Sequence, residues 1–308
     1  MPLTNLSVEV NEFREARRQA KIQALLAKLK RKPQKLLSFD EVRKELKPTG
    51  VRRRYLEDIP IDKIVGSVNR YVDFNRRFYP LQDSDEGRWA RIKMVVEEEG
   101  VMPIDVFKIG GMYFVMDGNH RVSIARQNDA THIEAFVTEL RTKIELTKDD
   151  DIHDVIMRAE HFELLEDTRL DELRPDVDIK VTLPGSYRKI YEHIEVHRYY
   201  MGLEKNREVT RDEAVISWLD NIYLPAVRAI RDYKVLEDLP NRTEADLYLW
   251  LKRHQMRLTG NFKNLVGEGL VAQDLVARYS KKPYRVLVRF YDKSLNIIEK
   301  IFKCFSKA

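Results

Sequence analysis

The sequence predicts an α+β fold, with strands in the central third of the chain and helices before and after them. Two apolar segments, 104–109 and 112–116, are predicted to pair as a hairpin through Gly110-Gly111, because both glycines tolerate positive φ. Apolar residues at helical spacing dominate the first 46 positions and most positions after 151. Hydrophobic residues make up 43% of the 308 positions, which is enough for a sizeable core.

The first fifty residues are predicted to form a basic helical extension, 1–50. Apolar residues at helical spacing indicate a helix over 9–31, which Pro33 follows. A second helix, over 38–46, begins with a Ser-x-x-Glu capping box. Pro48-Thr49-Gly50 then interrupts the pattern, and we expect the first domain boundary there.

The central segment, 51–145, is predicted to be a small mixed-sheet domain. Its expected elements are an extended entry over 51–64, a helix that starts at 83–85 and ends at Gly100, strands over 104–109 and 112–116, a helix over 119–127 and a strand over 132–138.

The rest of the chain is predicted to be mostly helical, as a domain over 146–262 and a basic helical segment over 263–308. The expected elements are a helix over 152–165, a strand over 179–183, a helix over 187–200, a long helix from the capping box of Thr210 and Glu213 through Tyr233 with a kink at Pro225, a helix over 244–258 and a strand over 286–290.

Composition and charge limit the function classes. The sequence has no apolar run of membrane-spanning length, no signal-peptide centre near its N-terminus and a single cysteine, Cys304, so we expect a cytoplasmic protein without membrane contact. Residues 1–54 hold fifteen Lys/Arg against six Asp/Glu, and residues 278–308 hold nine against two. These basic termini either bind a polyanion such as DNA or remain solvated.

The turn at residues 117–121 carries the clearest chemistry. A helix that starts directly after a strand presents free backbone N–H groups, which bind anions. Asp117 can hold a metal ion, and His120 and Arg121 can reach phosphate oxygens. Each residue also has a structural alternative, such as a helix cap, a satisfied buried histidine or an ion-paired arginine. The combination at one turn favours a phosphate site over separate coincidences at Asp117, Gly118, His120 and Arg121.

The same residues, Asp117-Gly118-Asn119-His120-Arg121, resemble the DG-x-HR signature of the ParB/sulfiredoxin-like superfamily. The resemblance extends upstream to 59–64, to Asn75-Arg76-Arg77 and to 99–104. It implies a small ParB/sulfiredoxin-like domain of α+β fold that binds a nucleotide. The chain also departs from the family pattern. Asn119 stands where sulfiredoxin chemistry needs a cysteine, and no acid stands at 66–69, where free-serine kinases carry one.

From the turn and the resemblance together we expect a nucleotide-binding protein. Asp117, His120 and Arg121 are the expected catalytic residues, and Asp117 would position Mg²⁺ with ATP or CTP. The expected binding residues are Gly118, Asn119, His120, Arg121, Ser123, Arg76 and Arg77. The sequence leaves open whether binding leads to turnover, as in a Mg-dependent NTPase or a small-molecule kinase.

Other functions remain as alternatives. The first is a DNA-binding transcriptional regulator or partition-like protein, with DNA held by the basic termini. A ParB-like nuclease has the least support, because the turn lacks the carboxylate cluster of a two-metal site. A homodimer is compatible with the helical second half. His193 and His197, four positions apart on a predicted helix, could share a metal ion but lack an obvious third ligand.

Overall fold

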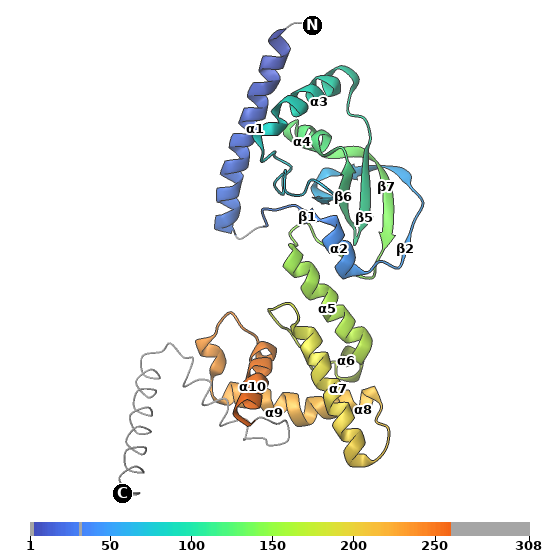
Figure 1. Cartoon of the computed structure of the whole chain (residues 1–308), viewed down its shortest axis with the longest axis vertical. Helices are drawn as coiled ribbons and strands as arrows, with labels where there is room; N and C mark the ends of the chain where they lie inside the picture. Colours follow the sequence, from blue (N-terminus) through green and yellow to red (C-terminus); the bar gives the residue numbers. More distant parts are fainter. Residues whose placement is uncertain (1–2, 31–32, 260–308) are drawn as a thin grey trace, which may run out of the picture. The chain divides into compact units, whose positions relative to one another are not determined.

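The computed structural model describes residues 3–30 and 33–259 of the chain. It confirms the α+β prediction, because a mixed sheet occupies the central segment and helices precede and follow it (Figure 1). The chain divides into two compact units between Ala159 and Glu160. The basic segment predicted over 263–308, with its strand at 286–290, lies outside the described residues.

The first unit is built on a seven-stranded mixed sheet in the order β1-β4-β6-β5-β7-β2, with β3 also paired to β7. The β5–β6 hairpin is antiparallel, whereas β4 pairs with β6, and β5 with β7, in parallel. The strands are β1 (Leu37–Ser38), β2 (Gly50–Val51), β3 (Tyr55–Pro60), β4 (Ile64–Ser67), β5 (Ile104–Ile109), β6 (Met112–Asp117) and β7 (His132–Arg141).

Four α-helices accompany this sheet: α1 (Leu3–Lys30), α2 (Phe39–Leu46), α3 (Glu86–Glu99) and α4 (Asn119–Gln127). The unit also has two short 3₁₀ segments. The segment η1 (Ile61–Lys63) lies between β3 and β4, and η2 (Asp83–Asp85) lies directly before α3. Of the capping box predicted at α2, one hydrogen bond is present: the Ser38 side chain accepts from the Glu41 backbone N–H.

The core of the first unit positions α4. The central strand β6 is buried over its first four residues, which explains why its sequence is continuously apolar and not alternating. Val122 and Ala125 of α4 belong to one buried cluster together with Val115 of β6 and Ile104 of β5. Helix α4 therefore follows the end of β6, a strand that pairs with β4 on one side and with β5 on the other.

Helix α1 packs on α3, and this contact supports α4 indirectly. The rings of Phe13 and Trp89 lie 5.9 Å apart, and Ile124 of α4 completes their buried cluster. Lys93 of α3 is 5% exposed, and its Nζ lies 3.4 Å from a Glu9 carboxylate oxygen on α1. A buried ammonium between carboxylates orients two helices because leaving either charge unpaired would be costly.

The second unit is helical. Its elements are most of α5 (Ile152–Thr168), α6 (Leu170–Leu173), α7 (Ser186–Lys205), α8 (Arg211–Trp218), a π-helical segment η3 (Leu219–Tyr223), α9 (Leu224–Asp232), a 3₁₀ segment η4 (Val235–Asp238) and α10 (Glu244–Thr259). The capping box of Thr210 and Glu213 is confirmed in both of its hydrogen bonds.

One prediction for the second unit was wrong. Residues 179–183 form no strand, because Asp246 of α10, and not a neighbouring strand, accepts hydrogen bonds from the backbone N–H and hydroxyl of Thr182. The predicted long helix is present, since helical residues run without a break from Arg211 to Asp232 and include Pro225. It passes through the π-helical turn η3 just before that proline, which lacks the N–H that an α-helical turn would need.

None of the helices in the ranges 3–30 and 33–259 combines the length and apolar character that a bilayer crossing requires.

Candidate functional site

The junction between β6 and α4 is the centre of the candidate site. Strand β6 ends at Asp117, Gly118 has φ +102°, and α4 begins at Asn119. A Cβ atom on residue 118 would lie 2.5 Å from Cγ2 of Ile104, and a side chain there would also occupy a backbone region that L-residues rarely adopt. Glycine is thus required at the point where the chain turns from strand to helix.

The start of α4 has uncapped backbone N–H groups. The Val122 N–H donates to the Gly118 carbonyl at 3.0 Å, which is the first helical hydrogen bond. Within the described residues, no acceptor contacts the backbone N–H groups of Asn119, His120 and Arg121, and Gly118 has no side chain that could cap them. Such N–H groups, with the positive end of the helix dipole, form a site for an anion.

Arg121 lies on this junction but is already bonded to the protein. Its guanidinium pairs with the Asp117 carboxylate and donates to the carbonyl oxygens of Met102 at 3.1 Å and Pro103 at 2.6 Å. The Asp117 side chain is 68% exposed, whereas that of Arg121 is 20% exposed. An anion that binds Arg121 would therefore have to compete with the exposed carboxylate of Asp117 rather than with the two carbonyl groups.

His120 lies on the other side of the junction, where it contacts Arg70. Nη1 of Arg70 lies 2.7 Å from Nε2 of His120, and Nη2 lies 2.7 Å from Oδ1 of Asp85. Nε of Arg70 donates to Asp73 at 2.6 Å. The edge of the His120 ring faces Phe74, with the ring centroids 5.3 Å apart. Arg70 is thus the centre of a polar cluster that reaches α4.

The charge of His120 follows from this environment. The side chain is 3% exposed, and burial, together with the Arg70 guanidinium, lowers the pKa of His120 to about 4. The imidazole is therefore neutral at physiological pH. It can offer a phosphate a hydrogen bond but no positive charge, which changes the role expected for it from the sequence.

Three polar atoms near the junction are buried without a hydrogen-bond partner in the described part of the chain: Nδ1 of His120, Oδ1 of Asn119 and Oδ2 of Asp85. The three residues are at most 7% exposed. Buried polar atoms nearly always have a partner, and a cluster of exceptions calls for a specific reason such as a bound ligand or ordered water.

The remaining predicted residues lie apart from residues 117–121 or serve the packing. Ser123 is 1% exposed, and its hydroxyl is contacted by Trp89 at 3.4 Å and Gln127 at 3.3 Å. Arg76 donates to the backbone carbonyl of Asp150 at 2.7 Å, and burial lowers its pKa to about 10. Arg77 is exposed. The structure therefore does not place Arg76 or Arg77 in contact with residues 117–121.

Sequence reasoning missed Arg70 and Asp85. They lie in a polar loop and a 3₁₀ segment without any recognisable spacing, and Arg70 meets His120 across 50 positions of sequence. Asp73, the first acid after the segment 66–69, does reach this cluster. Its two carboxylate oxygens accept from Arg70 at 2.6 Å and from Gln82 at 2.9 Å.

The protein's own donors do not form a magnesium cage at Asp117. Among the described residues, no group of three His, Cys, Asp or Glu side chains is placed to hold a metal ion, and Asp117 pairs with Arg121. An ion here would depend on ligand oxygens. The histidine pair on α7 is also explained by packing, since His193 contacts the Tyr248 hydroxyl at 2.9 Å and His197 the Ser217 hydroxyl at 3.0 Å.

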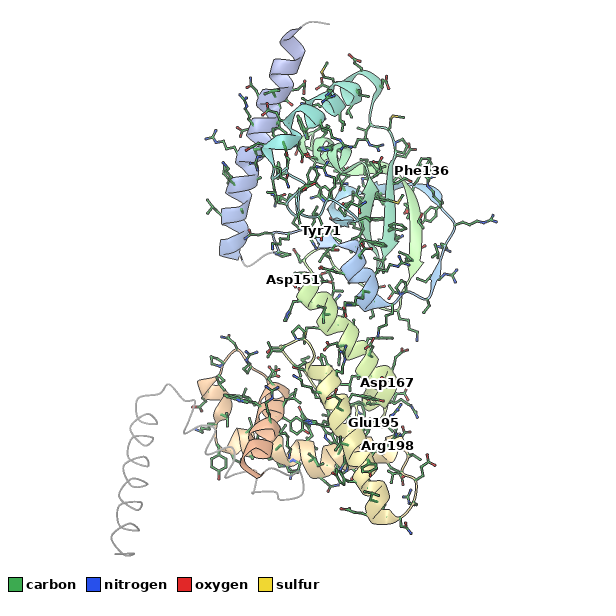
Figure 2. All side chains as sticks on the ribbon, viewed as in Figure 1. Tyr71, Phe136, Asp151, Asp167, Glu195 and Arg198 are labelled. Atoms are coloured by element: carbon green, nitrogen blue, oxygen red, sulfur yellow. The ribbon has the colours of Figure 1, made fainter. Side chains whose placement is uncertain are left out.

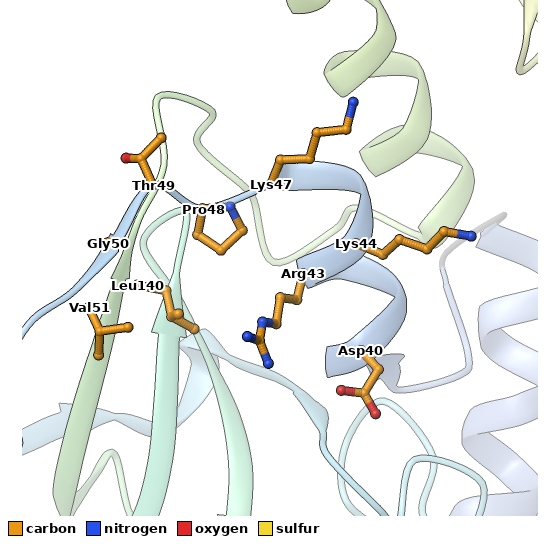
Figure 3. A pocket seen from close by; sticks show the side chains of 9 residues that line it. All are labelled: Asp40, Arg43, Lys44, Lys47, Pro48, Thr49, Gly50, Val51 and Leu140. Atoms are coloured by element: carbon orange, nitrogen blue, oxygen red, sulfur yellow. The ribbon is translucent and has the colours of Figure 1, made fainter.

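A second feature of the first unit is a cavity of about 580 Å³ between α2 and β2, which shares no residue with the junction. Three cations and one acid line it, and the Arg43 guanidinium points into the space between the helix and the strands (Figure 3). The lining residues are Asp40, Arg43, Lys44, Lys47, Pro48, Thr49, Gly50, Val51 and Leu140.

No family model and no curated protein sequence matches the chain. Among solved structures, it is similar to a sulfiredoxin from Arabidopsis thaliana, with 19% identity and a TM-score of 0.22, over 29% of this chain and 88% of that one. It is also similar to a Pnob8-like ParB-N domain, with 12% identity and a TM-score of 0.20, over 82% of this chain and 99% of that one. Matches at this level assign neither an activity nor a ligand to the chain.

Proposed function

We propose that the first unit binds the phosphate groups of a nucleotide at the β6–α4 junction. The observation that carries the proposal is the set of uncapped N–H groups at Asn119, His120 and Arg121, which follow a glycine that no other residue can replace without a clash. Three convergent N–H groups at a helix start are suited to phosphate oxygens. The guanidinium of Arg121 lies beside them and supplies the positive charge.

Binding would exchange one ionic partner of Arg121 for another. In the free protein the exposed Asp117 carboxylate occupies the guanidinium, while the carbonyl groups of Met102 and Pro103 hold its position. A phosphate can replace the carboxylate without moving the arginine, because Nη2, which pairs with Asp117, can donate to either group while Nη1 stays on the two carbonyls. Preorganisation of this kind favours binding, since little side-chain freedom is lost.

The proposal predicts opposite effects for two neighbouring variants. Arg121→Ala should abolish nucleotide binding, because the charge is lost. Asp117→Asn should strengthen binding several-fold, because the competing carboxylate becomes neutral while the side-chain shape is kept. Arg188→Ala on α7 is a matched control that removes an exposed arginine in the second unit.

The test is calorimetric titration of the full chain with ATP, ADP, CTP and GTP in Mg²⁺ buffer. The proposal fails if none of the four nucleotides binds the wild-type protein, and the location is wrong if Arg121→Ala binds as tightly as wild type. Measuring released phosphate in the same samples separates simple binding from hydrolysis or transfer. If phosphate is released, the expected catalytic residues Asp117, His120 and Arg121 are the first to be tested by substitution. If nucleotide binds and no phosphate is released, the protein binds the nucleotide without hydrolysing it.

A second candidate function is nucleic-acid binding, which the cationic cavity between α2 and β2 favours. Arg43 and Lys44 have no ion-pair partner within the described ranges, and Arg43 points into the cavity (Figure 3). Unpaired cations beside an open surface suit the phosphate backbone of DNA, and each phosphate contact adds about one unit to the salt dependence of log K.

This candidate is best tested with point variants. Deleting residues 1–54 would also remove α1, which packs on α3, and β1, which pairs with β4. Replacing Arg43 and Lys44 together by glutamine should weaken retention of duplex DNA and lower the salt slope by about two units. Unchanged retention would exclude this face as the DNA contact.

A further inference from the structure

The hydrogen bonds of Arg70 determine which nitrogen of His120 carries a proton. The guanidinium is held by three partners: Asp73 on Nε at 2.6 Å, Asp85 on Nη2 at 2.7 Å, and His120 on Nη1 at 2.7 Å. Gln82 donates to the second oxygen of Asp73 at 2.9 Å and so fixes that carboxylate as well. With both acids in place, Arg70 has little freedom to turn away from His120.

A guanidinium has N–H donors and no acceptor, so the bond between Arg70 and His120 must be donated by the arginine. Nε2 of His120 is then the acceptor and carries no proton. A neutral imidazole with a bare Nε2 has its proton on Nδ1. We infer that Arg70 is a positioning residue that holds His120 as the neutral Nδ1–H tautomer and thereby presents a hydrogen-bond donor at the start of α4.

The donor that this creates has no partner of its own. Nδ1 of His120 is buried and contacts no acceptor in the described part of the chain. It is the ring nitrogen nearer to the residue's own backbone, and His120 is the second residue of α4, whose first N–H groups are uncapped. The atom is closed to solvent, and a ligand oxygen reaches it only if side chains around the junction give way on binding.

Burial, with the neighbouring arginines, keeps the imidazole neutral. Asp73 and Asp85 favour its protonated form, whereas Arg70 and Arg88 oppose it, and burial also lowers the pKa of His120. The two acids are themselves bonded to Arg70, so they stabilise the guanidinium in preference to an imidazolium. If the proposed nucleotide site is correct, His120 therefore serves it as an uncharged donor, like a backbone N–H, while Arg121 supplies the charge.

The tautomer is measured directly by long-range ¹H–¹⁵N correlation on the full chain with labelled histidine, with the His120 signals assigned by their loss in His120→Asn. The expected wild-type pattern at pH 7 is a protonated Nδ1 and an unprotonated Nε2. Arg70→Lys, which keeps a donor, should retain this pattern, whereas Arg70→Met should lose it. A protonated Nε2 in the wild-type protein would overturn the inference, even if Arg70→Met does not fold.

The consequence for binding is tested with two variants of one side chain. His120→Asn places an amide N–H₂ near the position of Nδ1, and His120→Gln places it near that of Nε2. His120→Asn should bind nucleotide about tenfold more tightly than His120→Gln, as expected for one hydrogen bond to a charged group. The opposite order would overturn the inferred donor. If no nucleotide binds the wild-type chain, the proposed function fails, and the NMR pattern still decides the tautomer.

Discussion

Replacing Gly118 by alanine is expected to lower the free energy of unfolding of the first unit by about 3 kcal/mol, from backbone strain together with overpacking. At φ +102° an L-residue loses about 1–2 kcal/mol relative to glycine. The added Cβ would also lie 2.5 Å from Cγ2 of Ile104, a fully buried side chain that cannot move away freely. Overpacking of a core contact costs about 1–3 kcal/mol more.

Gly111, in the β5–β6 turn, is the matched control. It has φ +80°, and a Cβ atom there would meet nothing within 4 Å. Gly111→Ala should therefore show the backbone strain alone, about 1–2 kcal/mol. The difference between the two variants isolates the clash with Ile104. Ile104→Leu, which removes the Cγ2 branch, should cost less in the Gly118→Ala background than in the wild-type protein.

Urea unfolding followed by tryptophan fluorescence and by circular dichroism measures both variants, and Trp89 of α3 reports on the first unit. For a unit of this size, about 3 kcal/mol corresponds to a melting temperature lower by about 6–12 °C. The reasoning is refuted if Gly118→Ala is no more destabilising than Gly111→Ala. In that case the strand-to-helix turn tolerates a side chain, and glycine at this position has another cause.

Further predictions concern the packing and charges that support the site. Lys93→Met should destabilise the chain by about 3–5 kcal/mol because the Glu9 carboxylate is left buried without its ammonium, and a second change, Glu9→Gln, should recover most of this loss in urea unfolding. His120 has a pKa of about 4 in the folded protein and about 6.5 when unfolded. Its contribution to stability is therefore complete above pH 6.5. As the pH falls toward 4, the free energy of unfolding should decrease by up to about 3 kcal/mol. Urea unfolding at pH 7 and at pH 4.5 should therefore show that the free energy of unfolding decreases less with acid in His120→Asn than in the wild-type protein. Tyr248→Phe should cost about 1–3 kcal/mol in the second unit, because the Trp218 N–H loses its hydroxyl acceptor at 3.1 Å, and an equally stable variant would contradict this.

Elements with strong local signals were predicted with their observed bounds. Strand β5 and helix α4 cover the predicted residues 104–109 and 119–127. Their bounds were predictable because each is set by features next to it in the sequence: an apolar run, the glycine pair of the turn, and the glycine between strand and helix. Strand β7 continues to Arg141, beyond the predicted 138, because it pairs with β2 as well as with β3 and β5. Pairing with distant strands has no local sequence signal.

The sequence alone was sufficient to place a turn with free N–H groups at residues 117–121. The strand end, the glycine and the helix start are consecutive, and each depends on interactions with near neighbours in the chain. It also determined which side chains would flank the turn, namely Asp117, His120 and Arg121.

Only the tertiary structure decided what those side chains contact. Arg121 is held by carbonyl groups of the loop before β5, and His120 by Arg70 from the loop after β4. Both contacts join segments that lie next to each other only because the sheet orders β4, β6 and β5 side by side. The protonation state of a histidine depends on burial and on such neighbours, and these arise when the chain folds.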